Sequence, residues 1–415
     1  MVRRGTYDVA VVGGSLAGCA AAMLLARSGL HVALIERRAN LDAYKVACTH
    51  YIQASATPTI RRLGLDVAIE AAGGVRCALE VRTRWGWIQP PAETFGPGPS
   101  HGYSIRRQTL DPLVRRLAVE TPGVDALFGR SATGLEHDRD RLHLTLHRGA
   151  AEEESVAARV VVGADGRASK VAELARLPRR PSPNGRFAFW AYYRDVTLPV
   201  EARARFWHVR PDVAYVIPTD SGLTLIVVMP QLARLPEFKA DRVAAFDRLM
   251  RDIPEGPALE GARRVSPVLG ALNIPNVRRP PVTQRVALVG DAALACDPLP
   301  GVGCGWALQS AAWLADELGP AVAADRDPAG ALEAYAARHR AETRWHYAMI
   351  RSFSLARERR PYYERLLLKA ATRDEELAAR ALAFLQRRVN VPAYLTPSTF
   401  IRSTRVLGRE AARAR

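Results

Sequence analysis

The sequence predicts an α/β fold: a Rossmann-like domain with an inserted, mostly antiparallel sheet and a helical C-terminal region. Residues 7–35 run through a Val-rich strand, a glycine turn, an Ala/Leu-rich helix and a second strand, the pattern of a βαβ unit. Residues 186–229 hold four short segments rich in aromatic and β-branched residues, which are typical of strands. Residues 303–388 have helical character and are punctuated by three prolines.

Glycines mark the ends of the elements in the predicted βαβ unit. Strands are expected at residues 7–12 and 32–35, with a helix over residues 16–28 between them. Gly13 interrupts the first apolar run, and Gly29 ends the helix. Because the crossover of such a unit makes its strands parallel, we expect the sheet to be buried on both faces.

Two later apolar runs, at residues 159–163 and 286–290, are expected to rejoin this sheet, and each has an aspartate close behind its final glycine. Between these runs the chain changes character, as expected for a second sheet inserted between pieces of an α/β domain. The strands of this second sheet are predicted at residues 187–193, 204–208, 213–217 and 223–229.

Composition limits the possible partners. The chain has 415 residues, with 59 Lys and Arg against 42 Asp and Glu, a net charge of +17. Only four of these cations are lysines, and the arginines are dispersed among acidic residues, so no nucleic-acid partner is expected. No stretch approaches about 18 uncharged apolar residues, so no transmembrane segment is expected. Five cysteines without a C-x-x-C pair predict neither a disulfide framework nor a metal site, and they fit a reducing cytoplasm.

A glycine-rich motif opens the first helix. Residues 13–18 read Gly-Gly-Ser-Leu-Ala-Gly, which suits a tight turn, close approach of a pyrophosphate and phosphate binding at the helix N-terminus. Ser15 stands where such motifs usually have their middle glycine. Glu36 ends the second strand and could accept hydrogen bonds from both ribose hydroxyls of a dinucleotide. The predicted contacts are Gly13, Gly14, Ser15, Leu16, Ala17, Gly18, Glu36 and Arg37.

Two further motifs each place an aspartate after a strand. Residues 163–169 read Gly-Ala-Asp-Gly-Arg-Ala-Ser, and residues 290–293 read Gly-Asp-Ala-Ala. The second of these is followed by Asp297-Pro298-Leu299 and then by glycines at 301, 303 and 305. Taken singly, an aspartate at a strand end is typical of a structural cap.

The order of the three motifs resembles the flavoprotein monooxygenase superfamily typified by para-hydroxybenzoate hydroxylase, over roughly residues 5–330. The resemblance implies a Rossmann-like FAD-binding domain of the GR2 type, with Asp291 on the ribityl chain and the loop 298–303 beside the flavin. The sequence around Arg107 matches the family's R-x-x-L pattern, and Ala132 matches a position beside the adenine. The implied FAD contacts are Arg107, Ala132, Asp165, Asp291, Pro298, Gly301, Val302 and Gly303.

The resemblance also implies a division of the chain. Residues 1–177 and 281–330 are expected to form the FAD-binding domain, residues 178–280 the substrate-binding sheet, and residues 331–415 the C-terminal helical region. Residues 75–105 are expected to contribute to the substrate region.

The candidate substrate pocket draws on both regions. Alternation along residues 187–193 puts Phe189 on one face of the predicted sheet and Trp190 and Tyr192 on the other, and it leaves open which face lines the pocket. The candidate residues are Lys45, Cys48, His50, Phe189, Tyr192 and Tyr215. No catalytic residue is assigned, because the cofactor supplies the difficult chemistry.

The expected activity is that of an FAD-dependent monooxygenase, a hydroxylase or epoxidase acting through a flavin C4a-hydroperoxide. The expected substrate is a bulky aromatic, polyketide or polyene small molecule of specialised metabolism, and the expected reductant is NADPH or NADH. Ala172 stands where the family's second motif usually ends in Arg. That departure keeps open a separate reductase and a non-redox role as an FAD-containing cyclase.

Other branches of the superfamily give further alternatives. Lys45-x-x-Cys48 and Asp297-Pro298-Leu299 resemble motifs of the geranylgeranyl-reductase-like branch, which leaves an FAD-dependent alkene reductase open. A halogenase is disfavoured, because Val213 and Tyr215 stand where that branch carries its two tryptophans. Peripheral membrane contact through residues 362–369 and the basic tail is less favoured than packing of this helix on the body.

Overall fold

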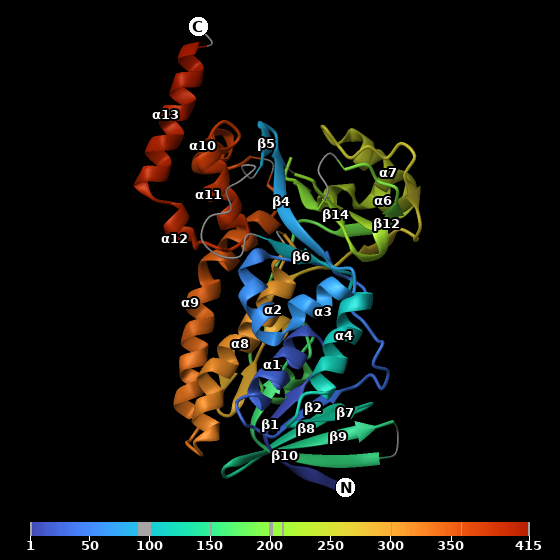
Figure 1. Cartoon of the computed structure of the whole chain (residues 1–415), viewed down its shortest axis with the longest axis vertical. Helices are drawn as coiled ribbons and strands as arrows, with labels where there is room; N and C mark the ends of the chain where they lie inside the picture. Colours follow the sequence, from blue (N-terminus) through green and yellow to red (C-terminus); the bar gives the residue numbers. More distant parts are fainter. Residues whose placement is uncertain are drawn as a thin grey trace.

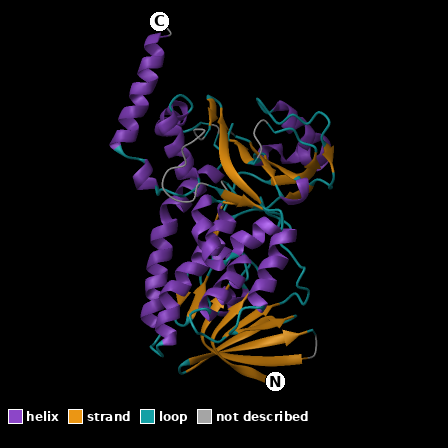
Figure 2. Ribbon diagram, viewed as in Figure 1, coloured by secondary structure: helices purple, strands orange, loops and turns teal. Residues whose placement is uncertain are grey.

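The computed structural model describes residues 2–89, 101–149, 152–198, 202–209, 211–299, 301–357 and 359–413. Two sheets lie toward opposite ends of the long axis, with a layer of helices between them and the C-terminal helices along one side (Figures 1 and 2). The prediction of a mixed α/β fold with an inserted sheet and a helical C-terminal region is confirmed.

The sheet nearest the N-terminus contains the predicted βαβ unit. Strand β1 (Val2–Val12) pairs in parallel with β2 (Val32–Glu36) and with β10 (Glu152–Gly163), and β10 pairs in parallel with β20 (Val286–Leu288). Strands β7 (Val124–Phe128) and β19 (Val282–Thr283) complete the order β19-β20-β10-β1-β2-β7. All four predicted strands are present. β1 and β10 begin earlier than predicted because their first halves pair with each other before the apolar runs start.

Helices cover one face of this sheet and strands cover the other. Val9 and Val11 face a layer of four helices, which are α1 (Leu16–Ala26), α4 (Arg107–Val119), α8 (Val302–Ala323) and α9 (Ala329–Ser354). Ala10 and Val12 face the ribbon of β8 (Ser131–Asp138) and β9 (Arg141–Arg148), with α5 (Lys170–Leu174) beside it. The sheet is therefore buried on both faces.

The second sheet has the order β16-β12-β15-β14-β13-β4-β6-β3, and its described pairs are antiparallel except for the parallel pair β13–β4. The four predicted strands are observed as β12 (Ala188–Arg194), β13 (Arg203–Trp207), β14 (Val213–Pro218) and β15 (Thr224–Met229). The others are β3 (Tyr51–Ile52), β4 (Val75–Thr83), β5 (Gly86–Ile88), β6 (Gly102–Ser104), β16 (Arg263–Arg264) and β17 (Leu269–Ala271). Within the predicted range 75–105, residues 90–100 lie outside the described residues.

The two faces of the second sheet pack against different helices. Phe189 lies on the face covered by α6 (Leu235–Ala240) and α7 (Arg242–Asp252). Trp190 lies on the opposite face, with α10 (Tyr362–Ala371) and α11 (Glu375–Leu385) in the same core. The predicted alternation along β12 is therefore confirmed.

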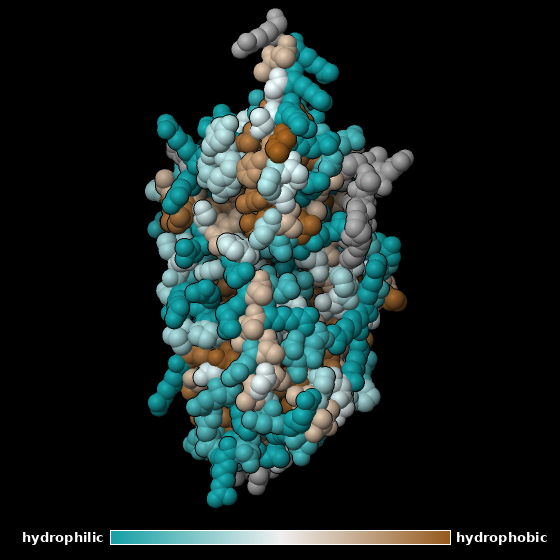
Figure 3. Space-filling model, turned by 90° about the vertical axis from the view of Figure 1, so that its left-hand side faces the viewer, coloured by the Kyte–Doolittle hydropathy of each residue, from teal (hydrophilic) through white to brown (hydrophobic). Residues whose placement is uncertain are grey.

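The C-terminal region is helical, as predicted, and packs on the second sheet. Leu367 of α10 is buried in its core, which agrees with the packing favoured for this helix. Helix α13 (Pro397–Arg413) follows α12 (Val391–Tyr394) and projects beyond the body at its far end (Figure 1). On the face in Figure 3, hydrophobic residues are scattered among hydrophilic ones. Among the described residues, no helix has the length and apolar character needed to cross a membrane.

The remaining elements are short. Helices α2 (Thr57–Leu63) and α3 (Leu65–Ala71) lie between the two sheets, and a small sheet contains β11 (Arg180–Ser182), β18 (Asn276–Arg278) and β21 (Leu294–Ala295).

Candidate functional site

The turn between β1 and α1 requires its glycines. Gly13 has φ +116°, and a Cβ at this position would lie 2.5 Å from the carbonyl oxygen of Ala164. A Cβ at Gly18 would lie 1.7 Å from the carbonyl oxygen of Gly13, so α1 could not start so close to the strand. The turn therefore leaves the first N–H groups of α1 at the carboxyl end of the sheet, where they can bind an anion.

Glu36 is held in a fixed orientation beside this turn. Its Oε2 accepts a hydrogen bond from the Gly14 N–H at 2.7 Å, and its Oε1 accepts one from the Arg38 N–H at 2.9 Å. Both Glu36 and Arg37 line the adjacent cavity. Each carboxylate oxygen still has a lone pair for a hydroxyl group.

Asp165 lines the same space and has one carboxylate oxygen without a hydrogen-bond partner. Its Oδ2 accepts a hydrogen bond from the Val171 N–H at 3.0 Å, but its buried Oδ1 has no hydrogen-bond partner. Asp165 lines the cavity together with Arg167. A buried acceptor without a partner is costly, so this oxygen indicates a place where a ligand donates.

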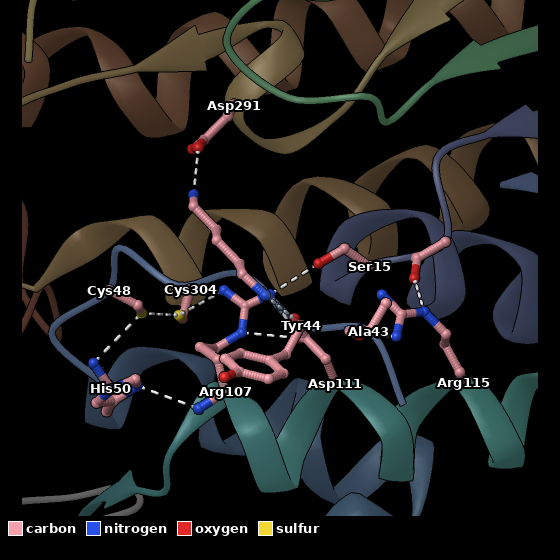
Figure 4. A network of polar contacts seen from close by, with 12 residues as sticks. Ser15, Ala43, Tyr44, Cys48, His50, Arg107, Asp111, Arg115, Asp291 and Cys304 are labelled. Carbon is pink, nitrogen blue, oxygen red and sulfur yellow. Dashed lines mark hydrogen bonds and ion pairs between the residues drawn. The ribbon is translucent and has the colours of Figure 1, made fainter. Parts of the chain in front are cut away.

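Asp291 follows β20 and forms an ion pair with Lys45, whose Nζ lies 2.9 Å from its Oδ2 (Figure 4). Burial raises the pKa of the Asp291 carboxyl, but the charge and hydrogen bond of Lys45, together with the charges of Arg167 and Arg107, hold the pKa below its usual value. The same pair raises the pKa of Lys45. Asp291 is therefore an ionised acceptor at the cavity wall.

Arg107 connects the first motif to the start of α8. Its Nη2 donates to Ser15 Oγ at 2.7 Å, its Nε donates to Asp111 Oδ1 at 2.7 Å, and its Nη1 approaches Cys304 Sγ at 3.9 Å (Figure 4). The side chain is buried. Arg107 thus holds the glycine turn and the α8 N-terminus in one arrangement.

His50 connects this network to the second sheet. The Arg107 N–H donates to His50 Nδ1 at 3.1 Å, and His50 Nε2 lies 2.5 Å from Tyr192 Oη. Because Nδ1 accepts, a neutral His50 carries its proton on Nε2 and donates it to Tyr192. Burial raises the pKa of Tyr192, which therefore keeps its own phenolic proton.

One cavity of about 750 Å³ extends from Glu36, Asp165, Asp291 and Arg107 to the second sheet. Its lining contains eight Lys or Arg residues against four Asp or Glu residues, an excess that suits a diphosphate. The opposite wall is mostly apolar and includes Ala188, Trp190, Val227 and Ile274, with Asn273 beside them.

Comparisons with known proteins agree with this geometry. Residues 6–347 match a protein family described as an FAD binding domain. The chain belongs to this FAD binding domain family.

Among curated relatives, protoasukamycin 4-monooxygenase from Streptomyces nodosus subsp. asukaensis is 27% identical, over 79% of this chain and 83% of its own. Kynurenine 3-monooxygenase from Xanthomonas axonopodis pv. citri (strain 306) is also 27% identical, over 80% of this chain and 75% of its own. Relatives of this kind mark the chain as a flavin-dependent oxidoreductase.

Solved structures share the fold. p-Nitrophenol 4-monooxygenase PnpA from Pseudomonas putida DLL-E4 superposes with a TM-score of 0.76 at 18% identity, over 94% of this chain and 99% of its own. The flavin-dependent brominase Bmp2 gives a TM-score of 0.77 at 19% identity, over 98% of this chain and 100% of its own.

The residues present fit an FAD molecule. The glycine turn leaves no room for a Cβ at Gly13 or Gly18, Asp165 Oδ1 lacks a partner, and the cavity is rich in cations. A flavin diphosphate needs such N–H groups and cations, and its ribose and ribityl hydroxyls need acceptors such as Glu36 and Asp291.

Most of the predicted FAD contacts line this one cavity. They are Gly13, Ser15, Leu16, Ala17, Glu36, Arg37, Arg107, Ala132, Asp165, Asp291, Pro298, Gly301 and Gly303. Gly14, Gly18 and Val302 lie behind the lining: Gly14 and Gly18 shape the turn, and Val302 is buried in the core at the start of α8.

The six candidate pocket residues separate into three groups. Lys45 and Cys48 line the cavity. His50 and Tyr192 form their hydrogen bond behind its lining. Phe189 and Tyr215 do not line the cavity: Phe189 stacks on Phe238 on the far face of the sheet, and Tyr215 is fully buried.

Sequence reasoning missed Arg115, Asp111 and Cys304. Arg115 Nε donates to the Gly14 carbonyl oxygen at 2.6 Å and so holds the turn from α4. Arg107, Asp111 and Arg115 are spaced four residues apart and share one face of α4. That spacing, in a helix with an otherwise apolar buried face, is the signal that could have found Asp111 and Arg115.

Proposed function

We propose that this chain is an FAD-dependent monooxygenase that hydroxylates or epoxidises a bulky, mostly apolar small molecule of specialised metabolism. The observation that carries the proposal is one continuous cavity, which runs from the glycine turn and Asp291 to the apolar wall around Trp190. When bound, FAD would supply activation of O₂ by its reduced form. NADPH or NADH is the proposed reductant, and water is the second product.

The residues of this chain would bind, orient and exclude water. The N–H groups at the start of α1 would hold the diphosphate, and Glu36 and Asp291 would accept hydrogen bonds from sugar hydroxyls. The N-terminus of α8 opens on the cavity at Gly303 and Cys304, where its positive end would stabilise negative charge on a bound group.

The wall on the second sheet supports the choice of substrate class. Trp190, Ala188, Val227 and Ile274 present aromatic and aliphatic surface, while the Asn273 amide can orient a polar substituent. The names of the relatives protoasukamycin 4-monooxygenase, kynurenine 3-monooxygenase and ubiquinone hydroxylase support oxygen insertion into unsaturated small molecules.

A second candidate function is FAD-dependent alkene reduction. Lys45 and Cys48, the residues shared with the geranylgeranyl-reductase-like branch, both line the cavity. A menaquinone reductase from Mycobacterium tuberculosis (strain CDC 1551 / Oshkosh) is 29% identical over 350 residues. This candidate requires the same cofactor and predicts a product that gains two hydrogens and no oxygen.

Isotope labelling distinguishes the two candidates. The FAD-loaded chain is incubated with NADPH or NADH under oxygen-18 gas, with naphthols and menadione as probe substrates. The proposal expects one labelled oxygen atom in the product and NAD(P)H oxidation that depends on the substrate. An unlabelled product in which a C=C bond has become saturated would favour the reductase, and failure to bind FAD would reject both.

A further inference from the structure

Two cysteines that are far apart in the sequence meet at the cavity. Cys48 Sγ lies 3.6 Å from Cys304 Sγ, although 256 residues separate them (Figure 4). Cys48 lies in the loop after β2, and Cys304 is the third residue of α8. Both residues line the cavity, so a small oxidant that enters it can reach the pair.

The surroundings of this pair favour a thiolate. The His50 N–H donates to Cys48 Sγ at 3.3 Å, and Arg107 Nη1 approaches Cys304 Sγ at 3.9 Å. The N-terminus of α8 adds its positive end next to Cys304. N–H donors, a guanidinium and a helix N-terminus are the features that make a cysteine reactive.

The two sulfur atoms are joined by a hydrogen bond in which either one can be the donor. The hydrogen bond from the Cys304 thiol holds the pKa of Cys48 well below its ordinary value, although burial acts in the opposite direction. The same hydrogen bond and burial raise the pKa of Cys304. Cys48 is therefore the nucleophile of the pair, and Cys304 carries the proton.

The other three cysteines provide an internal comparison. Burial raises the pKa of Cys19 and of Cys77 to about 12, so both stay protonated in apolar surroundings. Cys296 lines the same cavity, but burial raises its pKa as well. All five cysteines are free thiols in this structure.

We propose that Cys48 and Cys304 form a redox-active dithiol that hydrogen peroxide converts into an intramolecular disulfide. The Cys48 thiolate attacks one peroxide oxygen, the O–O bond breaks, a sulfenic acid forms, and the departing hydroxide takes a proton from solvent to become the first water. The Cys304 sulfur then attacks the Cys48 sulfur, the S–O bond breaks, and the second water leaves with the thiol proton. Overall, two thiols and one peroxide give one disulfide and two waters.

The disulfide would connect two segments that line the cavity. It would fix residues 45–49 to the N-terminus of α8, and it would remove the thiol that Arg107 now approaches. A cofactor that enters or leaves past this loop would therefore exchange more slowly in the oxidised protein. The modification itself does not depend on the proposed oxygenase activity, since the peroxide is added from solution.

The test follows the thiols of the full chain after treatment with a small excess of hydrogen peroxide. Non-reducing digestion uses trypsin together with a protease that cuts before aspartate, because Asp297 separates Cys296 from Cys304. We expect a cross-linked peptide containing Cys48 and Cys304, two hydrogens lighter than its reduced parts and lost on dithiothreitol treatment. Cys19, Cys77 and Cys296 stay free.

Serine variants identify which two cysteines form the cross-link. Cys48→Ser and Cys304→Ser should each abolish the cross-link, and Cys304→Ser should leave a trappable sulfenic acid on Cys48. Cys296→Ser, a cysteine from the same cavity, should leave the cross-link unchanged. The proposal is overturned if wild-type Cys48 goes directly to sulfinic acid while Cys304 stays free, if Cys296 is the partner, or if no thiol is consumed. The wild-type digest decides this even if a variant fails to fold.

Discussion

Lys45 and Asp291, which both line the cavity, form an ion pair with Nζ and Oδ2 2.9 Å apart, although one residue follows the first βαβ unit and the other follows β20 of the same sheet. This contact joins the third motif to the loop that follows the first βαβ unit. It also shows why an aspartate after β20 is more than a turn cap: its carboxylate faces the cavity and is kept ionised by a cation.

Replacing Asp291 should weaken FAD binding. Asp291→Ala removes an acceptor for a ligand hydroxyl and leaves Lys45 without its partner, so we expect the dissociation constant for FAD to rise about tenfold or more. Quenching of flavin fluorescence measures this constant. Asp327→Ala, at an exposed ion pair with Arg285 away from the cavity, is the control and should bind FAD as the wild type does. Equal affinity in both variants would contradict the role of Asp291.

Gly18→Ala should disrupt the glycine turn. The added Cβ would lie 1.7 Å from the Gly13 carbonyl oxygen, so α1 must shift away from the sheet. We expect a loss of about 2 kcal/mol or more in the free energy of unfolding, together with weaker FAD binding. Chemical denaturation measures the first effect. The control is Gly330→Ala in α9, where a Cβ meets no atom within 4 Å and no loss is expected.

Acid should destabilise the fold through two buried histidines. Burial, with a contribution from Arg340, lowers the pKa of His339 to about 4, and burial with Arg387 lowers the pKa of His346 to about 4. Both folded pKa values lie below the unfolded value of about 6.5, so the unfolded chain takes up protons first as the pH falls. The contribution of these neutral histidines to the free energy of unfolding is therefore fully present above pH 6.5 and is lost as the pH falls toward 4. Denaturation at pH 7.5 and pH 5 measures this loss.

Variants identify the histidines responsible. His339→Phe and His346→Phe should each reduce the pH dependence, since the unfolded chain then gains one proton fewer in this window. His137→Gln, at an exposed position of β8, should leave it unchanged. A pH dependence that persists in the two Phe variants would assign acid sensitivity to other groups.

Adjacent residues of β12 should have different effects on activity. Trp190 lines the cavity, and Phe189 packs against Phe238 on the other face. Trp190→Phe should raise KM for the substrate without changing the affinity for FAD, whereas Phe189→Leu should lower the free energy of unfolding by about 1 kcal/mol and leave KM unchanged. Steady-state kinetics and denaturation separate the two effects. A change in KM for Phe189→Leu alone would reverse the assignment of the faces.

The strands and the first helix could be predicted because their signals are local. Apolar runs, glycine breaks and the alternation along β12 require only neighbouring residues. The sequence could not say which face of β12 lines the cavity, because that depends on α6 and α7 on one side and on α10 and α11 on the other. These helices lie tens of residues away or more, and no local pattern records their contact.

The motifs predicted residues that line the cavity more reliably than aromatic character did. Gly13, Glu36 and Asp291 belong to patterns with fixed spacing, and all three line the cavity. Tyr215 was a candidate for its aromatic character alone, and the fold uses it as core. Cys304 lacked any local signal, because its significance depends on a cysteine 256 residues away.

The proposed function requires that one cavity hold FAD between the glycine turn, Asp165 and Asp291. Titration of the FAD-free chain with FAD, followed by flavin fluorescence and by native mass spectrometry, tests it most directly. We expect saturable quenching and the mass of one FAD per chain. Unquenched fluorescence with no bound flavin at saturating concentration would contradict it.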